Sequence, residues 1–156
     1  MQSEHEDMNM TKIDDTLGYM ICRTARKVHR HMEKIFSPYG LTLEQWVALK
    51  VISENPGCSQ KELAALLDKD QNTVKAMVDR LLQKEYVQRT VNPNDRRAFI
   101  LEITPLGEKT IIELSAQDEQ ENRILETGLG PEQTAQLRTL LQAAEKLVQE
   151  LRASVP

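Results

Sequence analysis

The segment from Asp70 to Lys84 constrains the fold of this chain more than any other. Its apolar side chains recur three and four positions apart, the spacing of one face of an α-helix, and they are Val74, Met77, Val78, Leu81 and Leu82. The opposite face carries Gln71, Asn72, Lys75, Ala76 and Asp79. Asp70 is placed to cap the first turn. The pattern predicts a helix that buries one side and presents amides and a cation near its N-terminal end.

The polar face of this helix has two interpretations. Amide and cationic side chains can make paired hydrogen bonds to base edges in a major groove, and the free N–H groups at a helix N-terminus suit phosphate. A polar face is also what any surface helix shows to water. The neighbouring segments therefore decide whether this helix is expected to bind DNA.

Composition bounds the fold class before any motif is considered. The chain has 156 residues, of which 40% are hydrophobic and only 4% aromatic, with six glycines. These values predict a mainly α-helical chain that forms one domain, or one small domain with helical extensions. No apolar stretch approaches the roughly 18 residues of a membrane span, and no N-terminal signal is evident. We expect a soluble, cytoplasmic protein with no membrane partner.

Charge is distributed unevenly along the chain. The net charge is −4, which is unfavourable for a nucleic-acid binder. Residues 69–97, however, hold seven cations against four anions, a net +3, whereas residues 104–156 hold five cations against nine anions, a net −4. Any contact with DNA is therefore expected to be confined to the basic middle of the chain.

Start signals predict three helices before the segment at 70–84. Asp14 or Asp15 is expected to cap a long helix that ends near Ser37, after a flexible arm over residues 1–13. Residues 42–45 (TLEQ) and 59–62 (SQKE) match the capping box. The helix after residue 42 is apolar nearly all round and is expected to be central. The helix after residue 59 and the helix at 70–84, joined by a tight connection, match a helix-turn-helix.

A β-hairpin is predicted after the helix-turn-helix. Tyr86–Val91 and Ala98–Ile103 alternate apolar and polar residues, and residues 92–97 (NPNDRR) form a turn-rich tip with two arginines. Hairpin tips are commonly polar for solubility alone. Arginine, however, suits the narrow minor groove, where the negative potential is strongest. The hairpin is therefore interpreted as a basic wing.

Two long helices are predicted at the C-terminal end. Thr104 caps the first, with Pro105 at its first position, and it runs to about Gly128; Gly130 and Pro131 restart the second. The second helix carries a near-heptad apolar stripe, formed by Leu137, Leu140, Leu141, Ala144, Leu147, Val148 and Leu151. This stripe either packs on its own domain or forms a dimer seam, and we favour the seam.

The predicted fold is mainly α with a small β-hairpin wing. It comprises a winged helix-turn-helix DNA-binding domain over residues 38–103, and N- and C-terminal dimerisation helices over 14–37 and 104–156.

The segment NPNDRR at 92–97, followed by ITPLG at 103–107, combines D-R-R and I-T-x-x-G at a fairly specific spacing. Further support comes from GLTLEQW at 40–46, TV at 73–74 and VDRL at 78–81. In these motifs the sequence resembles the MarR family of bacterial winged helix-turn-helix regulators, over roughly residues 14–152. The resemblance implies a homodimer in which the first helix and the last two helices interlock. It also implies two winged domains that read a pseudo-palindromic operator in double-stranded DNA.

The resemblance also implies roles for individual residues. In the wing, Arg97 enters the minor groove, Asp95 orients it through a charge-assisted contact, and Arg96 lies nearer the DNA backbone. On the recognition helix we assign Gln71, Asn72 and Lys75 to the major groove. Thr73 and Arg80 are assigned to phosphate or to fixing the helix. The family varies at the recognition positions, so the bases that are read do not follow from the match.

Cysteine and histidine chemistry is expected to be minor. Family members that sense organic hydroperoxides carry a reactive cysteine about one turn before Cys22, where this chain has Gly18. Cys22 lies in an apolar stretch and is expected to be buried and inert, and Cys58, in a turn, to be more exposed. The spacing favours neither a disulfide nor zinc. His29 and His31 diverge on a helix, so no metal site and no cofactor are expected.

The leading functional hypothesis is a repressor that a small aromatic or amphipathic ligand releases from DNA. Candidate ligand-binding residues are Tyr19, Arg23, Tyr39 and Trp46, although ordinary packing also explains each of them. Two alternatives stay open: a cysteine-based redox-sensing regulator, and a winged-helix module that binds proteins without DNA. An enzyme is not expected, because the chain has no Gly-rich phosphate loop and no nucleophile–base pairing at a useful spacing.

Overall fold

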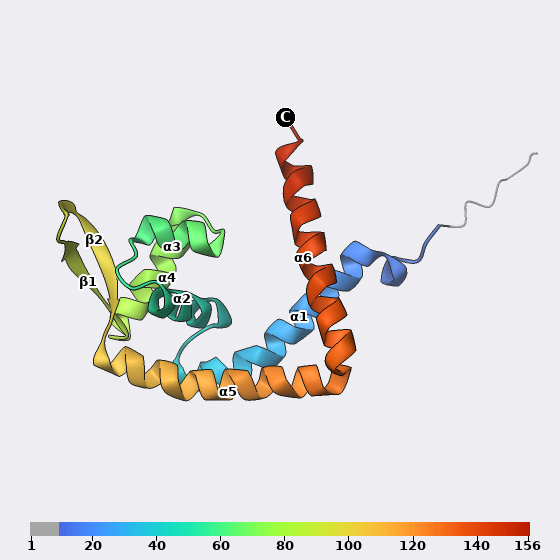
Figure 1. Ribbon diagram of the computed structural model, residues 1–156, viewed down its shortest axis with the longest axis horizontal. Helices are drawn as coiled ribbons and strands as arrows, with labels where there is room; N and C mark the ends of the chain where they lie inside the picture. Colours follow the sequence, from blue (N-terminus) through green and yellow to red (C-terminus); the bar gives the residue numbers. More distant parts are fainter. Residues whose placement is uncertain (1–9) are drawn as a thin grey trace, which may run out of the picture. The chain divides into compact units, whose positions relative to one another are not determined.

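The computed structural model describes residues 10–156, so residues 1–9 of the predicted N-terminal arm lie outside the described residues. The helices are α1 (Leu17–Phe36), α2 (Leu43–Glu54), α3 (Gln60–Leu67), α4 (Gln71–Gln83), α5 (Pro105–Leu129) and α6 (Pro131–Ala153), and the strands are β1 (Val87–Asn92) and β2 (Asp95–Ile103) (Figure 1). Two short 3-10 turns cover Ile13–Asp15 and Ser37–Tyr39. The predicted fold class, mainly helical with one antiparallel hairpin, is confirmed.

The chain divides into two compact units, residues 1–111 and 112–156. In the first unit, α2 contacts α1, α3, α4 and β2, as expected for a helix that is apolar on most sides. The core of this unit is built mainly from α2, α3, α4 and the base of the hairpin. Its completely buried larger side chains are Phe36, Leu49, Ile52, Leu63, Val74, Val78, Leu81 and Leu101.

Helices α2 and α3 begin where the local sequence predicts. Both predicted capping boxes are present, with the Thr42 side chain accepting from the Gln45 N–H and the Ser59 side chain from the Glu62 N–H. The start of α1 differs from the prediction. Asp14 and Asp15 lie in a 3-10 turn, and Thr16 occupies the N-cap position without a side-chain cap. The Thr16 hydroxyl instead donates to the carbonyl of Ile13, a local bond that competes with capping.

The hairpin is confirmed, with a shorter turn than predicted. Strand pairing runs from Val87 opposite Ile103 to Val91 opposite Phe99, and an irregularity follows before Asn92 pairs with Asp95. Residues 95–97 therefore belong to β2 rather than to the turn. Only the base of the hairpin is buried: Val87 and Leu101 are in the core, whereas Val91 and Phe99 are more than half exposed.

The junction between the hairpin and α5 is tightly packed around Gly107. Thr104 caps α5 as predicted, because its hydroxyl oxygen accepts the Gly107 N–H at 3.0 Å while its own backbone N–H donates to the Tyr86 carbonyl at 3.1 Å. A Cβ added at Gly107 would lie 2.1 Å from that carbonyl oxygen and 2.9 Å from the Ile103 side chain. The base of the wing and α5 are thus joined at a position where only glycine fits.

Replacing Gly107 with alanine is expected to lower the free energy of unfolding by about 1–3 kcal/mol, the usual cost of overpacking. Urea denaturation measures the effect. The matched control is Gly128→Ala in the same helix, where an added Cβ meets nothing within 4 Å. Because glycine is a poor helix former, the control is expected to be neutral or to stabilise by up to about 1 kcal/mol. Equal effects of the two substitutions would contradict the packing argument.

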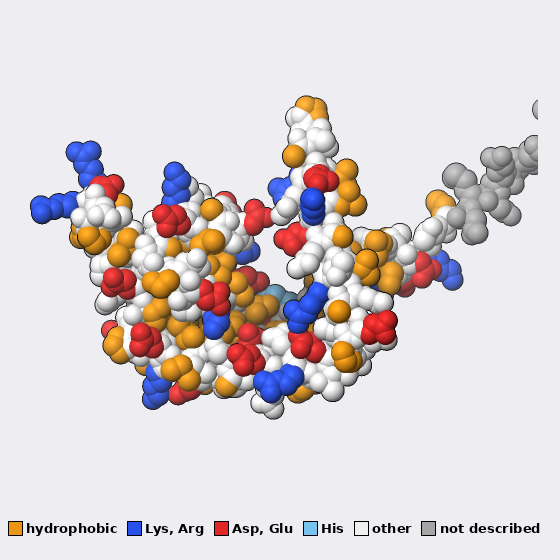
Figure 2. All heavy atoms as spheres, viewed as in Figure 1, with side chains coloured by type: hydrophobic (Ala, Val, Ile, Leu, Met, Phe, Trp, Pro, Cys, Tyr) orange, Lys and Arg blue, Asp and Glu red, His pale blue; other side chains and the backbone are white. Residues whose placement is uncertain are grey.

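The second unit contains the rest of α5 and all of α6, and little of its apolar surface is covered. No residue of α6 is buried. Leu140 is 66% exposed, and Leu147 and Leu151 are each 56% exposed. Figure 2 shows hydrophobic side chains at the surface along α6. Among residues 10–156, no helix combines the length and hydropathy needed to cross a membrane.

Candidate nucleic-acid interface

Helix α4 is divided into a buried and an exposed side, as its sequence predicts. Val74, Met77, Val78 and Leu81 are buried, while Leu82 at the edge of the stripe is half-buried. The predicted DNA-binding side chains of this helix are all exposed: Gln71, Asn72, Thr73, Lys75 and Arg80. The first three lie in the first turn, so the polar groups gather at the N-terminal end of the helix.

Asp70 fixes this N-terminal end. Its carboxylate accepts the backbone N–H of Thr73 at 2.8 Å and the Thr73 hydroxyl at 2.6 Å. These hydrogen bonds, first from the Thr73 side chain and then from its backbone, hold the pKa of Asp70 below its ordinary value. Thr73 therefore has a clear structural role in the capped first turn, which is compatible with the assignment of fixing the helix.

The cap makes stability depend on pH in a defined direction. Since the pKa of Asp70 is lower in the folded chain, its ionised form favours folding. This stabilisation is fully present above about pH 3.9, the pKa of an aspartate in an unfolded chain. It is lost as the pH falls through the lower pKa that Asp70 has in the folded chain. Asp70→Asn keeps an oxygen acceptor but no charge. We expect it to be less stable than the parent above about pH 5, with the difference shrinking below pH 4 in urea titrations. A difference that is constant with pH would contradict this assignment.

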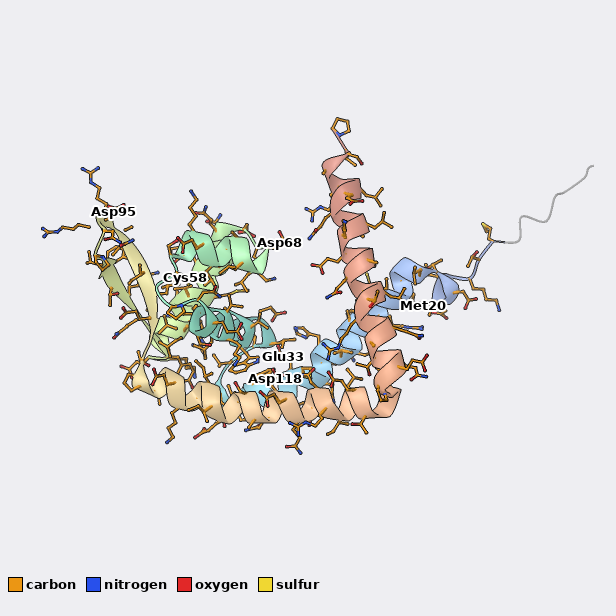
Figure 3. All side chains as sticks on the ribbon, in the orientation of Figure 1. Met20, Glu33, Cys58, Asp68, Asp95 and Asp118 are labelled. Atoms are coloured by element: carbon orange, nitrogen blue, oxygen red, sulfur yellow. The ribbon has the colours of Figure 1, made fainter. Side chains whose placement is uncertain are left out.

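The wing tip is organised by short-range hydrogen bonds to the backbone. The Asn92 side chain accepts the Asn94 N–H at 2.9 Å, and the Asp95 carboxylate accepts the Arg97 N–H at 3.0 Å. We expected Asp95 to pair with the Arg97 guanidinium, but its observed contact is with the backbone. The side chains of Arg96 and Arg97 are exposed. Figure 2 shows cationic side chains projecting at the outer end of the hairpin, where Figure 3 labels Asp95.

A contact that sequence reasoning missed connects the wing to the helices. Arg89 of β1 donates to Asp79 of α4 at 3.3 Å and to Gln60 of α3 at 3.2 Å. Lys75 also lies 3.6 Å from Asp79. One sign of this contact was present in the sequence. Arg89 occupies an inward position of an alternating strand, where an apolar residue is usual. The contact holds the wing and the polar side of α4 together in one unit.

The four candidate ligand-binding residues do not form one site in the chain. Tyr19 and Arg23 are in contact, with the guanidinium 5.6 Å from the ring centroid. Trp46 is only 2% exposed and stacks on Phe36 at the other end of α1. Seventeen residues of helix separate Tyr19 from Phe36, about 25 Å at 1.5 Å per residue. Trp46 is a core residue, as ordinary packing predicts, and the ligand-binding role of the four residues stays a prediction.

The two cysteines have the opposite exposure to that predicted. Cys22 is exposed, because its side of α1 is uncovered in the single chain, as the neighbouring Met20 and Ile21 also are. Cys58 is 5% exposed. Its carbonyl accepts the Leu101 N–H at 2.9 Å, which draws the turn against β2. Burial, and secondarily Glu62, raise the pKa of the Cys58 thiol, so its reactive thiolate is disfavoured.

Comparisons of sequence identify related regulators. The model of the MarR family matches residues 41–99. The chain is 32% identical over 97 residues to the HTH-type transcriptional regulator BilQ of Clostridioides difficile (strain CD3), covering 62% of this chain and 66% of that protein. It is 36% identical over 108 residues to the BilQ regulator of Clostridium symbiosum (strain WAL-14163), covering 69% and 74%.

Comparisons of structure agree. The transcriptional repressor CouR bound to a 23-mer DNA duplex has a TM-score of 0.79 at 28% identity, covering 89% of this chain and 99% of that chain. A mutant of MarR from E. coli, complexed with operator DNA, has a TM-score of 0.76 at 28% identity, covering 82% and 92%. Both structural similarities cover much more of the chain than residues 41–99, which the family model matches.

Proposed function

Because this chain belongs to the MarR family of transcriptional regulators, we propose that it is a homodimer that binds a pseudo-palindromic operator and represses transcription until a small-molecule ligand releases it. In this proposal the winged helix-turn-helix of residues 38–103 contacts DNA, the helices of 14–37 and 104–156 form the dimer, and the protein acts with its operator in the cytoplasm. Half-sites would lie about 10 base pairs apart or a little more.

One observation carries the DNA-binding part of the proposal. A single compact unit presents a helix with an exposed polar N-terminal turn and, tied to it through Arg89 and Asp79, a hairpin with two exposed arginines at its tip. A helix fits the major groove, and arginine suits the narrower minor groove beside it. The two related structures whose descriptions include DNA support double-stranded DNA as the partner of this chain.

The uncovered apolar side chains support the dimer. Helix α6 has 23 residues, none of them buried, and carries a near-heptad leucine stripe. Packing within one chain therefore cannot stabilise it. Leu17 and Ile21 of α1 are also exposed, at 71% and 40%. Exposed apolar surfaces of this extent mark protein–protein contacts in soluble proteins. A second copy of the chain is the partner that the family relationship favours.

Ligand release requires two conformations with different DNA affinities. A ligand changes DNA affinity only through its own different affinities for the two conformations. In a dimer, the spacing of the two recognition helices is the quantity it would have to change. The proposed ligand is small and aromatic or amphipathic.

The test of this function is the salt dependence of duplex binding by the purified protein. Binding should weaken steeply with salt, because phosphate contacts release counterions. Lys75→Ala should lower the affinity, because Lys75 is assigned to base edges in the major groove. The matched control is Lys109→Ala, which removes the same charge from an exposed position on α5. A slope of log K against log salt near zero for the parent protein, or equal affinities of the Lys75→Ala and Lys109→Ala variants for the duplex, would contradict this use of α4.

A further inference from the structure

Three side chains that can ligate metals meet where α1 contacts α2 in the first unit. His29 and Glu33 lie four residues apart on α1 and therefore share a face, and Glu44 lies in the first turn of α2. The Nε2 atom of His29 is 2.8 Å from Glu44 Oε1 and 3.7 Å from Glu33 Oε1. One ligand atom from each residue lies within 4.8 Å of the other two. Figure 3 labels Glu33 on α1.

These separations suit a single bound ion. Metal–nitrogen and metal–oxygen bonds of about 2.0–2.2 Å at a tetrahedral angle place two ligand atoms roughly 3.3 Å apart. The two distances from His29, 2.8 and 3.7 Å, lie on either side of this value. The Glu33 carboxylate already accepts the Leu43 N–H at 2.7 Å, which orients it in the way that hydrogen bonds orient the ligands of known metal sites.

Charge and exposure also suit a divalent cation. Carboxylates bind metals in their ionised form and histidine in its neutral form, so the three ligands together would carry −2 toward a bound cation. The three side chains are 29–42% exposed, which gives an ion a path from solvent and room for water ligands.

We infer that His29, Glu33 and Glu44 form a site for one divalent transition-metal ion that joins α1 to α2. Imidazole selects zinc and similar ions over magnesium and calcium, and zinc binds such mixed sites more tightly than manganese. The expectation from sequence was that His29 takes no part in a metal site, because His31 diverges from it. The structure supplies carboxylates on the same and the next helix instead of a second histidine.

The test is zinc binding to the full-length protein in competition with a chromophoric chelator, without DNA. The variants are His29→Gln and Glu44→Gln, with His31→Gln as a matched control on the same helix. Glutamine at position 44 keeps an oxygen that can accept from His29. Circular dichroism establishes folding first, and Glu33→Gln, whose amide oxygen can still accept the Leu43 N–H, replaces any variant that does not fold.

We expect one zinc ion per chain and an affinity about tenfold or more weaker in each site variant, with a change of less than about twofold in His31→Gln. Zinc should raise the melting temperature of the parent protein but not of His29→Gln, because an ion that binds only the folded state stabilises it. Absence of saturable zinc binding, or equal affinities in the parent and all variants, would overturn the inference. Since no DNA is used, either result is independent of the proposed function.

Discussion

Replacing Arg97 with alanine is expected to weaken binding to the operator by about 10- to 100-fold while the dimer persists. Arg97 is exposed at the tip of β2, and the Asp95 carboxylate fixes its backbone rather than its guanidinium. The Asp95 carboxylate therefore leaves the Arg97 guanidinium available for the proposed contact with DNA. A single arginine contact with a groove contributes about 1–3 kcal/mol, which corresponds to this loss of affinity.

Fluorescence anisotropy with a labelled duplex measures the loss, and size-exclusion chromatography measures the dimer. The matched control is Arg123→Ala, which removes an exposed arginine from α5 in the acidic second unit. Arg97→Lys keeps the charge without the planar guanidinium, and we expect an intermediate affinity. An unchanged dissociation constant in Arg97→Ala, with the dimer intact, would remove Arg97 from the DNA interface.

Replacing Leu140 with aspartate is expected to separate the dimer and, with it, to abolish operator binding at micromolar protein. Leu140 is 66% exposed in the single chain, so the substitution costs little within one subunit. In a leucine seam, however, the carboxylate would be buried without a partner, which is strongly unfavourable. We expect the dimer dissociation constant to rise by about 100-fold or more, since truncating central contacts alone costs about 2 kcal/mol or more.

Analytical ultracentrifugation over a range of concentrations measures this change. Gln142→Asp introduces the same charge on the polar side of α6 and should leave the dimer unchanged. A Leu140→Asp protein that remains a dimer, or a parent protein that is already a monomer at micromolar concentration, would contradict the assignment of α6 to the dimer.

The features that could be predicted from sequence are those that depend on neighbouring residues. The capping boxes at Thr42 and Ser59, the Asp70 cap and the Thr104–Pro105 start each involve groups within three positions of one another. The buried stripe of α4 and the hairpin follow from periodicity. For these elements, local propensity and hydrophobic pattern point to the same structure, and the prediction succeeds.

The features that could not be predicted from sequence depend on contacts between distant segments. Cys58 is buried because its turn bonds to β2, more than 40 positions away, and no local pattern marks that contact. Trp46 was a plausible ligand contact until its stacking on Phe36 placed it in the core. Arg89 and the cluster of His29, Glu33 and Glu44 likewise combine residues from different elements. The spacing of apolar residues along the chain reflects local structure, so it carries little information about contacts between residues of different elements.

The most direct test of the central claim is the selection of bound duplexes from a random pool by the purified protein. If two copies of the α4–wing surface read DNA as a symmetric pair, the selected sequences will converge on an inverted repeat with half-sites about 10 base pairs apart or a little more. The complex will contain two chains per duplex. Failure to enrich any sequence, or enrichment of a single site without a repeat bound by one chain, would contradict the account.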